Sequence, residues 1–153
     1  MAGATIAVAS DHAGFDLKEL LKRDLQEAGY AVLDLGTNST ASVDYPDFGR
    51  AMGEAIAGGK AERGVLVCGS GIGISIAANR NPKVRAVLAH DVTSARLSRE
   101  HNDANVISIG GRMHDEAFCL QLVDTFLTTP FTNDERHVRR IGLISGYEES
   151  GKI

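Results

Sequence analysis

The sequence predicts an α/β protein built on a five-stranded parallel sheet, and three observations support this class. Short β-branched or aliphatic runs alternate with longer amphipathic stretches, which is the pattern of β-α-β units. The length of 153 residues fits a single domain, residues 1–153. The composition, 43% hydrophobic and 24% charged, is that of a folded chain rather than a disordered one.

The elements follow one another in that alternation. The expected strands are residues 5–9, 31–34, 64–67, 85–89 and 105–109. The expected helices between them are residues 14–28, 45–57, 73–79, 92–100 and 115–127. The first helix has apolar residues at helical spacing: Phe15, Leu17, Leu20, Leu21 and Leu25. Glycines stand where helices end, at Gly29, Gly58 and Gly59.

A sixth, C-terminal helix is expected at residues 133–147. It follows the break at residues 128–130 and begins with the capping pattern Asn-Asp-Glu. No strand is expected after it. A terminal helix with no strand to cover often docks on a neighbouring copy, so the sequence raises a homodimer that exchanges this helix.

Charge and composition exclude some classes of function. The net charge of -4 provides no basic field for nucleic acid. No apolar stretch reaches the ~18–20 residues that span a bilayer, and the first residues lack the pattern of a secretory signal. The two cysteines, Cys68 and Cys119, form neither a redox pair nor a zinc set, so free thiols in a reducing compartment are expected. We therefore expect a cytoplasmic protein without a membrane or nucleic-acid partner.

The strongest local motif is CGSGIG, residues 68–73, which follows an apolar run and opens a helix. Its unshielded backbone N–H groups can converge on an anion. The glycine spacing is not that of a dinucleotide fingerprint, and no Lys-Ser/Thr of a P-loop follows. Cys68 stands at the strand end facing a helix N-terminus, where a thiolate is stabilised. The motif predicts proton abstraction from carbon with capture of an oxyanion; a tight turn with a buried small cysteine is the alternative.

Two histidines extend this chemistry. Asp11 and His12 follow the first strand, and they can place an acid and an imidazole at the same cleft or cap a helix. His101 ends a polar helix before the fifth strand, where it can act in catalysis or pair with the helix dipole.

Arginines near the C-terminus suggest a phosphate clamp. Arg136 and Arg140 stand four apart on one face of the last helix, and Arg112 follows two glycines after the fifth strand. Together they can bind a phosphate, although a solvated basic face is the alternative. We found no spacing of metal ligands, so no metal is expected.

In combination these segments resemble one family, the type B ribose-5-phosphate isomerases, which are grouped with galactose-6-phosphate isomerase subunits. The matching segments span nearly the whole chain: residues 10–15, 44–46, 68–80, 85–86, 99–105, 110–112 and 136–140. The resemblance implies a Rossmann-like three-layer α/β/α sandwich that acts without cofactor or metal. It also implies a homodimer, or a tetramer, with an active site shared between chains, so that the clamp and His101 come from the partner.

The resemblance also assigns catalytic roles. Cys68 would be the base that moves a proton between C2 and C1 of the open-chain sugar, and Ser70 would relay protons at the oxygens. Backbone N–H groups of the loop would hold the enediolate: Gly69, Gly71, Ile72 and Gly73. One branch of the family uses a Glu on the following helix as base, but residues 74–76 here read Ile-Ser-Ile, which supports Cys68.

The remaining roles concern the ring and the phosphate. His101 resembles the group that opens the furanose ring, with Asp11 near the ring oxygen or hydroxyls. Tyr45 and Asn102 would line the sugar site. The phosphate ligands would be His12, Arg112, Arg136 and Arg140.

We therefore expect an aldose–ketose isomerase that interconverts D-ribose 5-phosphate and D-ribulose 5-phosphate through an enediolate. The first alternative is the same reaction on a hexose 6-phosphate, galactose or allose 6-phosphate. A second is a non-catalytic module that binds a sugar phosphate or a nucleotide. A third is a hydrolase that uses Ser75 or Cys68 with His101, although the nucleophile-elbow pattern is absent.

Overall fold

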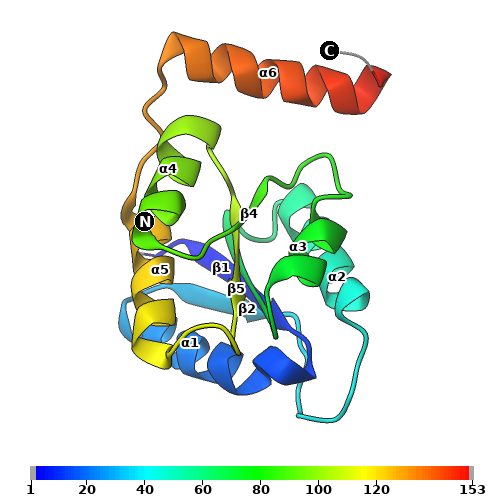
Figure 1. Ribbon diagram of the computed structural model, residues 1–153, viewed down its shortest axis with the longest axis vertical. Helices are drawn as coiled ribbons and strands as arrows, with labels where there is room; N and C mark the ends of the chain where they lie inside the picture. The colour runs from blue at the N-terminus through cyan, green and yellow to red at the C-terminus, as the bar shows by residue number, and fades with distance from the viewer. Residues whose placement is uncertain (1–2, 152–153) are drawn as a thin grey trace.

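The computed structural model describes residues 3–151, and its centre is one parallel sheet in the order β2-β1-β3-β5-β4 (Figure 1). The strands are β1 (Thr5–Ser10), β2 (Ala31–Asp34), β3 (Arg63–Cys68), β4 (Ala86–Leu88) and β5 (Val106–Gly110). The strands β1, β3 and β5 are buried along almost their whole length, which is why they read as apolar runs without alternation. The predicted parallel α/β class is confirmed.

Helices cover both faces of the sheet and enclose two apolar cores. One face carries α1 (Phe15–Glu27), α4 (Val92–Asn102) and α5 (Glu116–Thr128), and the core beneath them includes Leu21 and Phe126. The other face carries α2 (Tyr45–Ala57) and α3 (Ile72–Ala78), above a core that includes Met52 and Ile74. These are the three layers expected from the family resemblance.

The strand order locates the site. From β1 the chain passes to β2 on one side and then to β3 on the other, so the order reverses between β1 and β3. In open α/β sheets, ligands bind outside the carboxyl ends of the strands at such a reversal. In the register, Ser10 pairs with Val67, and Cys68 pairs with Gly110. The loops after β1, β3 and β5 therefore begin side by side.

Most element boundaries lie one to three residues from the sequence expectation, and only residues 31–34 and 45–57 match it at both ends. A short 3-10 helix (His12–Gly14) precedes α1, because the Asp11 carboxylate accepts a hydrogen bond from the Gly14 amide at 3.1 Å. The fourth strand starts at Ala86 rather than at Arg85, whose amide donates to the Asn105 side chain instead. The last helix, α6 (Glu135–Ser150), starts two residues later and ends three residues later than expected.

A buried lysine supports the loop beside the site. Lys18 of α1 is fully buried, and its Nζ lies 2.9 Å from both carboxylate oxygens of Asp34. Burial acts to raise the pKa of Asp34, but hydrogen bonds from Lys18, the Gly36 amide and Lys22 outweigh it, so that the pKa is lowered. The Gly36 carbonyl in turn accepts from the Ser10 amide. This chain of contacts connects α1 and β2 to the end of β1.

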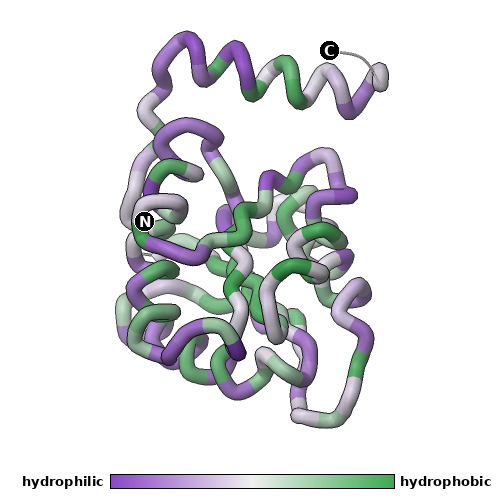
Figure 2. The backbone as a smooth tube through the Cα atoms, viewed as in Figure 1, coloured by the Kyte–Doolittle hydropathy of each residue, from purple (hydrophilic) through white to green (hydrophobic). Residues whose placement is uncertain are grey.

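The helix α6 stands apart from the sandwich and passes across the end of α4 (Figure 1). Only His137 of this helix is buried. Apolar residues recur along it among hydrophilic ones (Figure 2). Four large apolar side chains of α6 are exposed: Val138, Leu143, Ile144 and Tyr147. Its apolar positions therefore have little to pack against within the chain.

Candidate active site

A cavity of about 710 Å³ lies at the carboxyl ends of β1, β3 and β5. Eight of its lining residues are ones that the sequence singles out: Asp11, Tyr45, Cys68, Gly69, Ser70, Ile72, Gly73 and Arg112. Two further lining residues, Ile76 and Met113, were not anticipated. Both are exposed apolar side chains, and sequence alone carries no signal that distinguishes them from ordinary surface residues.

The thiol of Cys68 is the last side chain of β3 and is held by its own loop. The Gly71 amide donates to Cys68 Sγ at 3.1 Å, a contact that stabilises negative charge on sulfur. Gly71 has a φ of +79°, and a Cβ there would lie 2.8 Å from the Ile109 carbonyl carbon, so only glycine fits. The buried hydroxyl of Ser108 donates to the Gly71 carbonyl at 2.7 Å and fixes the turn.

The rest of the loop presents a hydroxyl and an aromatic ring to the cavity. Ser70 Oγ accepts from the Ile72 amide at 3.2 Å, which leaves its hydroxyl proton free to face a ligand. At Gly73 a Cβ would lie 2.6 Å from the Tyr45 ring, so this glycine allows the ring to approach the loop. Two of the amides that we expected to bind an oxyanion, those of Gly71 and Ile72, thus also donate to side chains of the loop itself.

The residues after β1 combine capping with a place at the cavity. Asp11, rather than the histidine of the structural alternative, caps the short helix through the Gly14 amide, and it also lines the cavity. His12 Nδ1 accepts from the Val43 amide at 3.1 Å. This contact places the proton of the neutral ring on Nε2, where it can donate to an anion.

Arg112 supplies positive charge at the same place. Its amide donates to the Gly69 carbonyl at 3.0 Å. Its side chain passes over the loop, because a Cβ on Gly69 would lie 3.6 Å from Arg112 Nη1. A guanidinium thus lies beside the hydroxyl and thiol of the loop, which suits an anionic ligand.

Six predicted site residues do not line this cavity. Two of them, His12 and Gly71, lie in the loops after β1 and β3, and the other four are His101, Asn102, Arg136 and Arg140. The helix α4 ends at Asn102 and leads into the start of β5, so His101 and Asn102 lie at the amino edge of the sheet. The five residues of β5 separate the two edges by about 16 Å at ~3.3 Å per residue. Arg136 and Arg140 lie on α6, beyond the same amino edge (Figure 1).

A histidine stack organises this second group. The His137 ring stacks on His101, with centroids 4.4 Å apart and planes at 21°. Burial, with added repulsion from Arg136, lowers the pKa of His137. No role for His137 was expected from the sequence. Its place directly after Arg136 and three residues before Arg140 gave no indication that it packs on α4.

Arg99 connects α4 by hydrogen bonds to the segment that leads into α6. Its side chain is 3% exposed, and Nη1 donates to the Ala104 carbonyl at 2.6 Å and to Asp103 at 2.7 Å. Its Nε donates to the Thr129 carbonyl at 3.2 Å. These bonds hold the helix of His101 and the approach to α6 in one arrangement.

Residues 3–151 contain no group of three or more His, Cys, Asp or Glu side chains placed to hold a metal ion. None of the helices in this range is both long and apolar enough to cross a bilayer.

The fold and the cavity define an α/β protein that receives a small polar ligand at a strand-order reversal, next to a thiol and a guanidinium. Comparison with known proteins gives the family. The Ribose/Galactose Isomerase family model matches residues 6–144, and the chain belongs to this family.

Similar proteins agree with this assignment. A putative sugar phosphate isomerase of Bacillus subtilis is 41% identical over 145 residues, which cover 94% of this chain and 97% of the relative. Ribose-5-phosphate isomerase B of Mycobacterium tuberculosis is 40% identical, covering 98% of this chain and 93% of the relative. The structure of Clostridium thermocellum ribose-5-phosphate isomerase B matches with a TM-score of 0.94 at 43% identity, covering 97% of this chain and 99% of that one.

Proposed function

We propose that this chain interconverts D-ribose 5-phosphate and D-ribulose 5-phosphate by proton transfer in the cavity at the carboxyl ends of β1 and β3. The main support for this proposal is the Cys68 thiol, whose Sγ accepts a hydrogen bond from the Gly71 amide. The same cavity also contains Ser70, Asp11 and Arg112. A binding module has no use for a carbon base at this position. The names of the relatives support ribose 5-phosphate as the substrate.

The reaction needs one base for carbon and one relay for oxygen. In the direction of ribulose 5-phosphate, the Cys68 thiolate removes the proton from C2 of the open-chain aldose. The electron pair moves through C1 to its oxygen, which gives the enediolate. Cys68 then returns the proton to C1, while the Ser70 hydroxyl moves a proton between the two oxygens. Nothing is gained or lost, so the reaction requires no redox cofactor.

We further propose that a second copy of the chain completes the site. Among residues 3–151 the large exposed apolar side chains fall into two groups. One group lies around the cavity: Tyr45, Ile72, Ile76 and Met113. The other lies on α6: Val138, Leu143, Ile144 and Tyr147. A twofold arrangement in which α6 of each copy covers the cavity rim of the other would bury both groups.

This dimer would bring the separated functional groups together. Arg136 and Arg140 of one copy would join His12 and Arg112 of the other around the phosphate. His101 would reach the ring oxygen and open the furanose, with Asn102 beside the sugar. Since α6 lies at the amino edge, its arginines cannot serve the cavity of their own chain across the sheet. Two free cysteines are consistent with a cytoplasmic location.

Subunit mixing tests the shared site. One chain carries Cys68→Ala, and the other carries Arg136→Ala with Arg140→Ala. At concentrations of ribose 5-phosphate well below KM, each alone should be inactive or severely impaired. After random reassortment of dimers, half are mixed and each mixed dimer has one intact site, so activity should return to about a quarter of wild type. The control replaces the second chain by one that carries all three substitutions, and it should restore nothing. No recovery from exchanged subunits would reject the shared site while leaving the isomerase assignment in place.

The substrate assignment is tested by steady-state rates on ribose 5-phosphate, allose 6-phosphate and galactose 6-phosphate, measured side by side. We expect the highest kcat/KM on the pentose phosphate. A higher value on either hexose phosphate would replace the proposed substrate by a hexose 6-phosphate. Absence of turnover on all three, with tight binding, would favour the non-catalytic module.

A further inference from the structure

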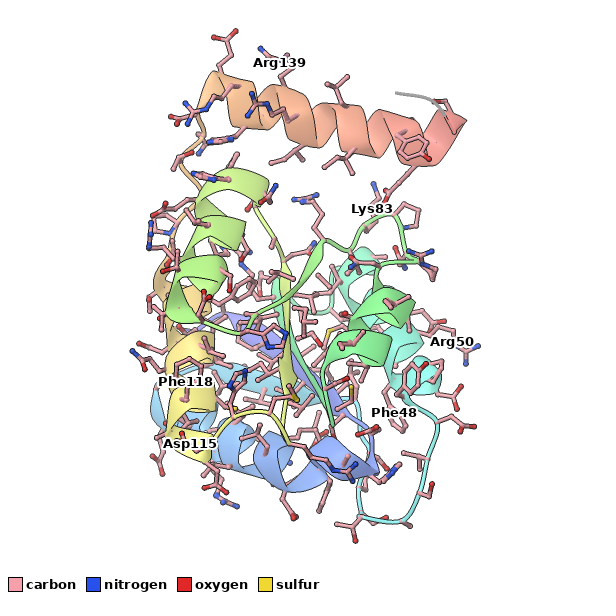
Figure 3. All side chains as sticks on the ribbon, in the orientation of Figure 1. Phe48, Arg50, Lys83, Asp115, Phe118 and Arg139 are labelled. Carbon is pink, nitrogen blue, oxygen red and sulfur yellow. The ribbon has the colours of Figure 1, made fainter. Side chains whose placement is uncertain are left out.

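Two histidines outside the proposed site face each other at the carboxyl edge. His90 follows β4 and His114 follows the turn after β5. His90 Nδ1 lies 3.3 Å from His114 Nε2, and the ring planes are inclined by 58°. They line a shallow pocket of about 370 Å³ with Met113, Asp115 and Phe118. Asp115 and Phe118 mark its place at the start of α5 (Figure 3).

At 3.3 Å the two nitrogens are within hydrogen-bond distance, and the same separation also suits two ligands of one metal ion. Two imidazole nitrogens about 2.0–2.1 Å from a tetrahedral Zn²⁺ are about 3.3–3.4 Å apart. At a right angle, as in square-planar or octahedral sites, the same bond lengths would put them about 2.9 Å apart. The observed separation therefore favours a tetrahedral ion.

The charges around the pair also favour a cation. Asp91 and Asp115 follow the two histidines directly, and each uses Oδ1 to cap its helix. The two helix N-termini contribute roughly +0.5 each, against two full negative charges. No lysine or arginine lines the pocket. The local charge stays negative, and a dication would reduce it.

We propose that His90 and His114 form a binding site for Zn²⁺, with His90 Nδ1 and His114 Nε2 as its two protein ligands. Water fills the other coordination positions, since no third side chain of residues 3–151 completes a ligand set. The ion would connect the loop after β4 to the turn after β5. That turn also carries Arg112 and Met113, which line the substrate cavity. This inference concerns binding and does not depend on the proposed isomerase reaction.

The test is carried out on the full chain with Cys68→Ala, because the cavity thiol is itself a zinc ligand. Zn²⁺ is titrated by calorimetry in buffer without chelator, and the imidazole nitrogens are observed by ¹H–¹⁵N correlation. We expect one Zn²⁺ per chain, with shifts at His90 Nδ1 and His114 Nε2. By linkage, Zn²⁺ should also raise the Tm. Mg²⁺, which prefers oxygen ligands, should do none of this.

Substitutions separate this pair from other histidines. Adding His90→Ala should abolish zinc binding and the rise in Tm; His90 is exposed, so the fold should be retained. Adding His101→Ala should leave zinc binding unchanged, because the rings of His101 and His137 are stacked face to face. The proposal is overturned if zinc binding survives His90→Ala, if other histidine nitrogens shift, or if the unsubstituted histidine pair shows no saturable binding. The nitrogen spectra of the chain with both histidines decide the matter even if a variant fails to fold.

Discussion

The two edges of the sheet differ in what they can do alone. The carboxyl edge holds a cavity in which Cys68, Ser70 and Arg112 face a common space. The amino edge holds His101, stacked on His137, and the arginines of α6, but these do not line that cavity. Arg139 projects from the side of α6 that faces away from the sandwich (Figure 3).

In the proposed dimer, this difference would make one folded chain only part of the enzyme. The sheet itself separates the two edges, so no rearrangement of side chains can join them. The exposed apolar residues follow the same division, with one group at the cavity and the other on α6. In the proposed dimer, the carboxyl edge carries out proton transfer, and the amino edge of the partner binds phosphate and opens the ring. Substitutions at the two edges should therefore impair different steps of the reaction.

The largest effect is expected from Cys68→Ala at the carboxyl edge. Loss of the carbon base should lower kcat by ~10²–10⁴-fold, while binding of ribose 5-phosphate changes only a few-fold. The matched control is Cys119→Ala, which removes a thiol from the core under α5 and should retain kcat. A Cys68→Ala enzyme with more than a tenth of the wild-type kcat would place the base elsewhere.

A smaller effect, of another kind, is expected at the amino edge. Arg136→Ala or Arg140→Ala should reduce kcat/KM for ribose 5-phosphate by about 1.5–3 kcal/mol, the range for hydrogen bonds to charged groups. The loss should appear mainly in KM, because the phosphate is bound equally in the ground and transition states. Arg136 also pairs with Asp134 at 3.5 Å, but both side chains are about half exposed, so this pair contributes little.

The substrate without phosphate provides the control for these arginines. Ribose does not use the clamp, so its kcat/KM should change little in either variant. Equal proportional losses on ribose and ribose 5-phosphate would mean that the arginines support the fold or the dimer. The phosphate ligands would then have to be sought around Arg112 and Arg139.

Most of the fold follows from local pattern. Buried parallel strands require apolar runs, and helices that cover them require an apolar stripe, so both are visible in a single sequence. Lys18 shows where pattern fails. It lies in the buried stripe of α1, and its carboxylate partner, Asp34, is 16 residues away. Local spacing carries no signal for a pair that forms only when α1 packs beside β2.

The site was predictable to the extent that strand ends are. Loops after parallel strands meet at one edge, so Asp11, Cys68 and Arg112 could be grouped before the structure was known. The direction of α4 could also be predicted from the sequence, because a helix that leads into a parallel strand ends at the amino edge of the sheet. The stack of His137 on His101 could not be predicted, since it depends on how the connection after Thr128 places α6 over α4. A link to a second copy came only from the family resemblance and the unpaired last helix.

The smallest effect is expected for alkylation of Cys119, a thiol that lies in the core rather than at the cavity. Burial, with added repulsion from Asp115 and Glu116, raises the pKa of Cys119 to about 11. Because this pKa lies above pH 8, the thiol is protonated there, and only about one molecule in a thousand carries the reactive thiolate. Iodoacetamide at pH 8 should therefore modify Cys68 through the cavity and abolish turnover, while Cys119 stays unmodified until the chain is unfolded. Peptide mass spectrometry over time, with and without ribose 5-phosphate, measures both sites, and substrate should protect Cys68 alone. Equal rates of modification at the two cysteines would show that the cavity gives Cys68 no special access.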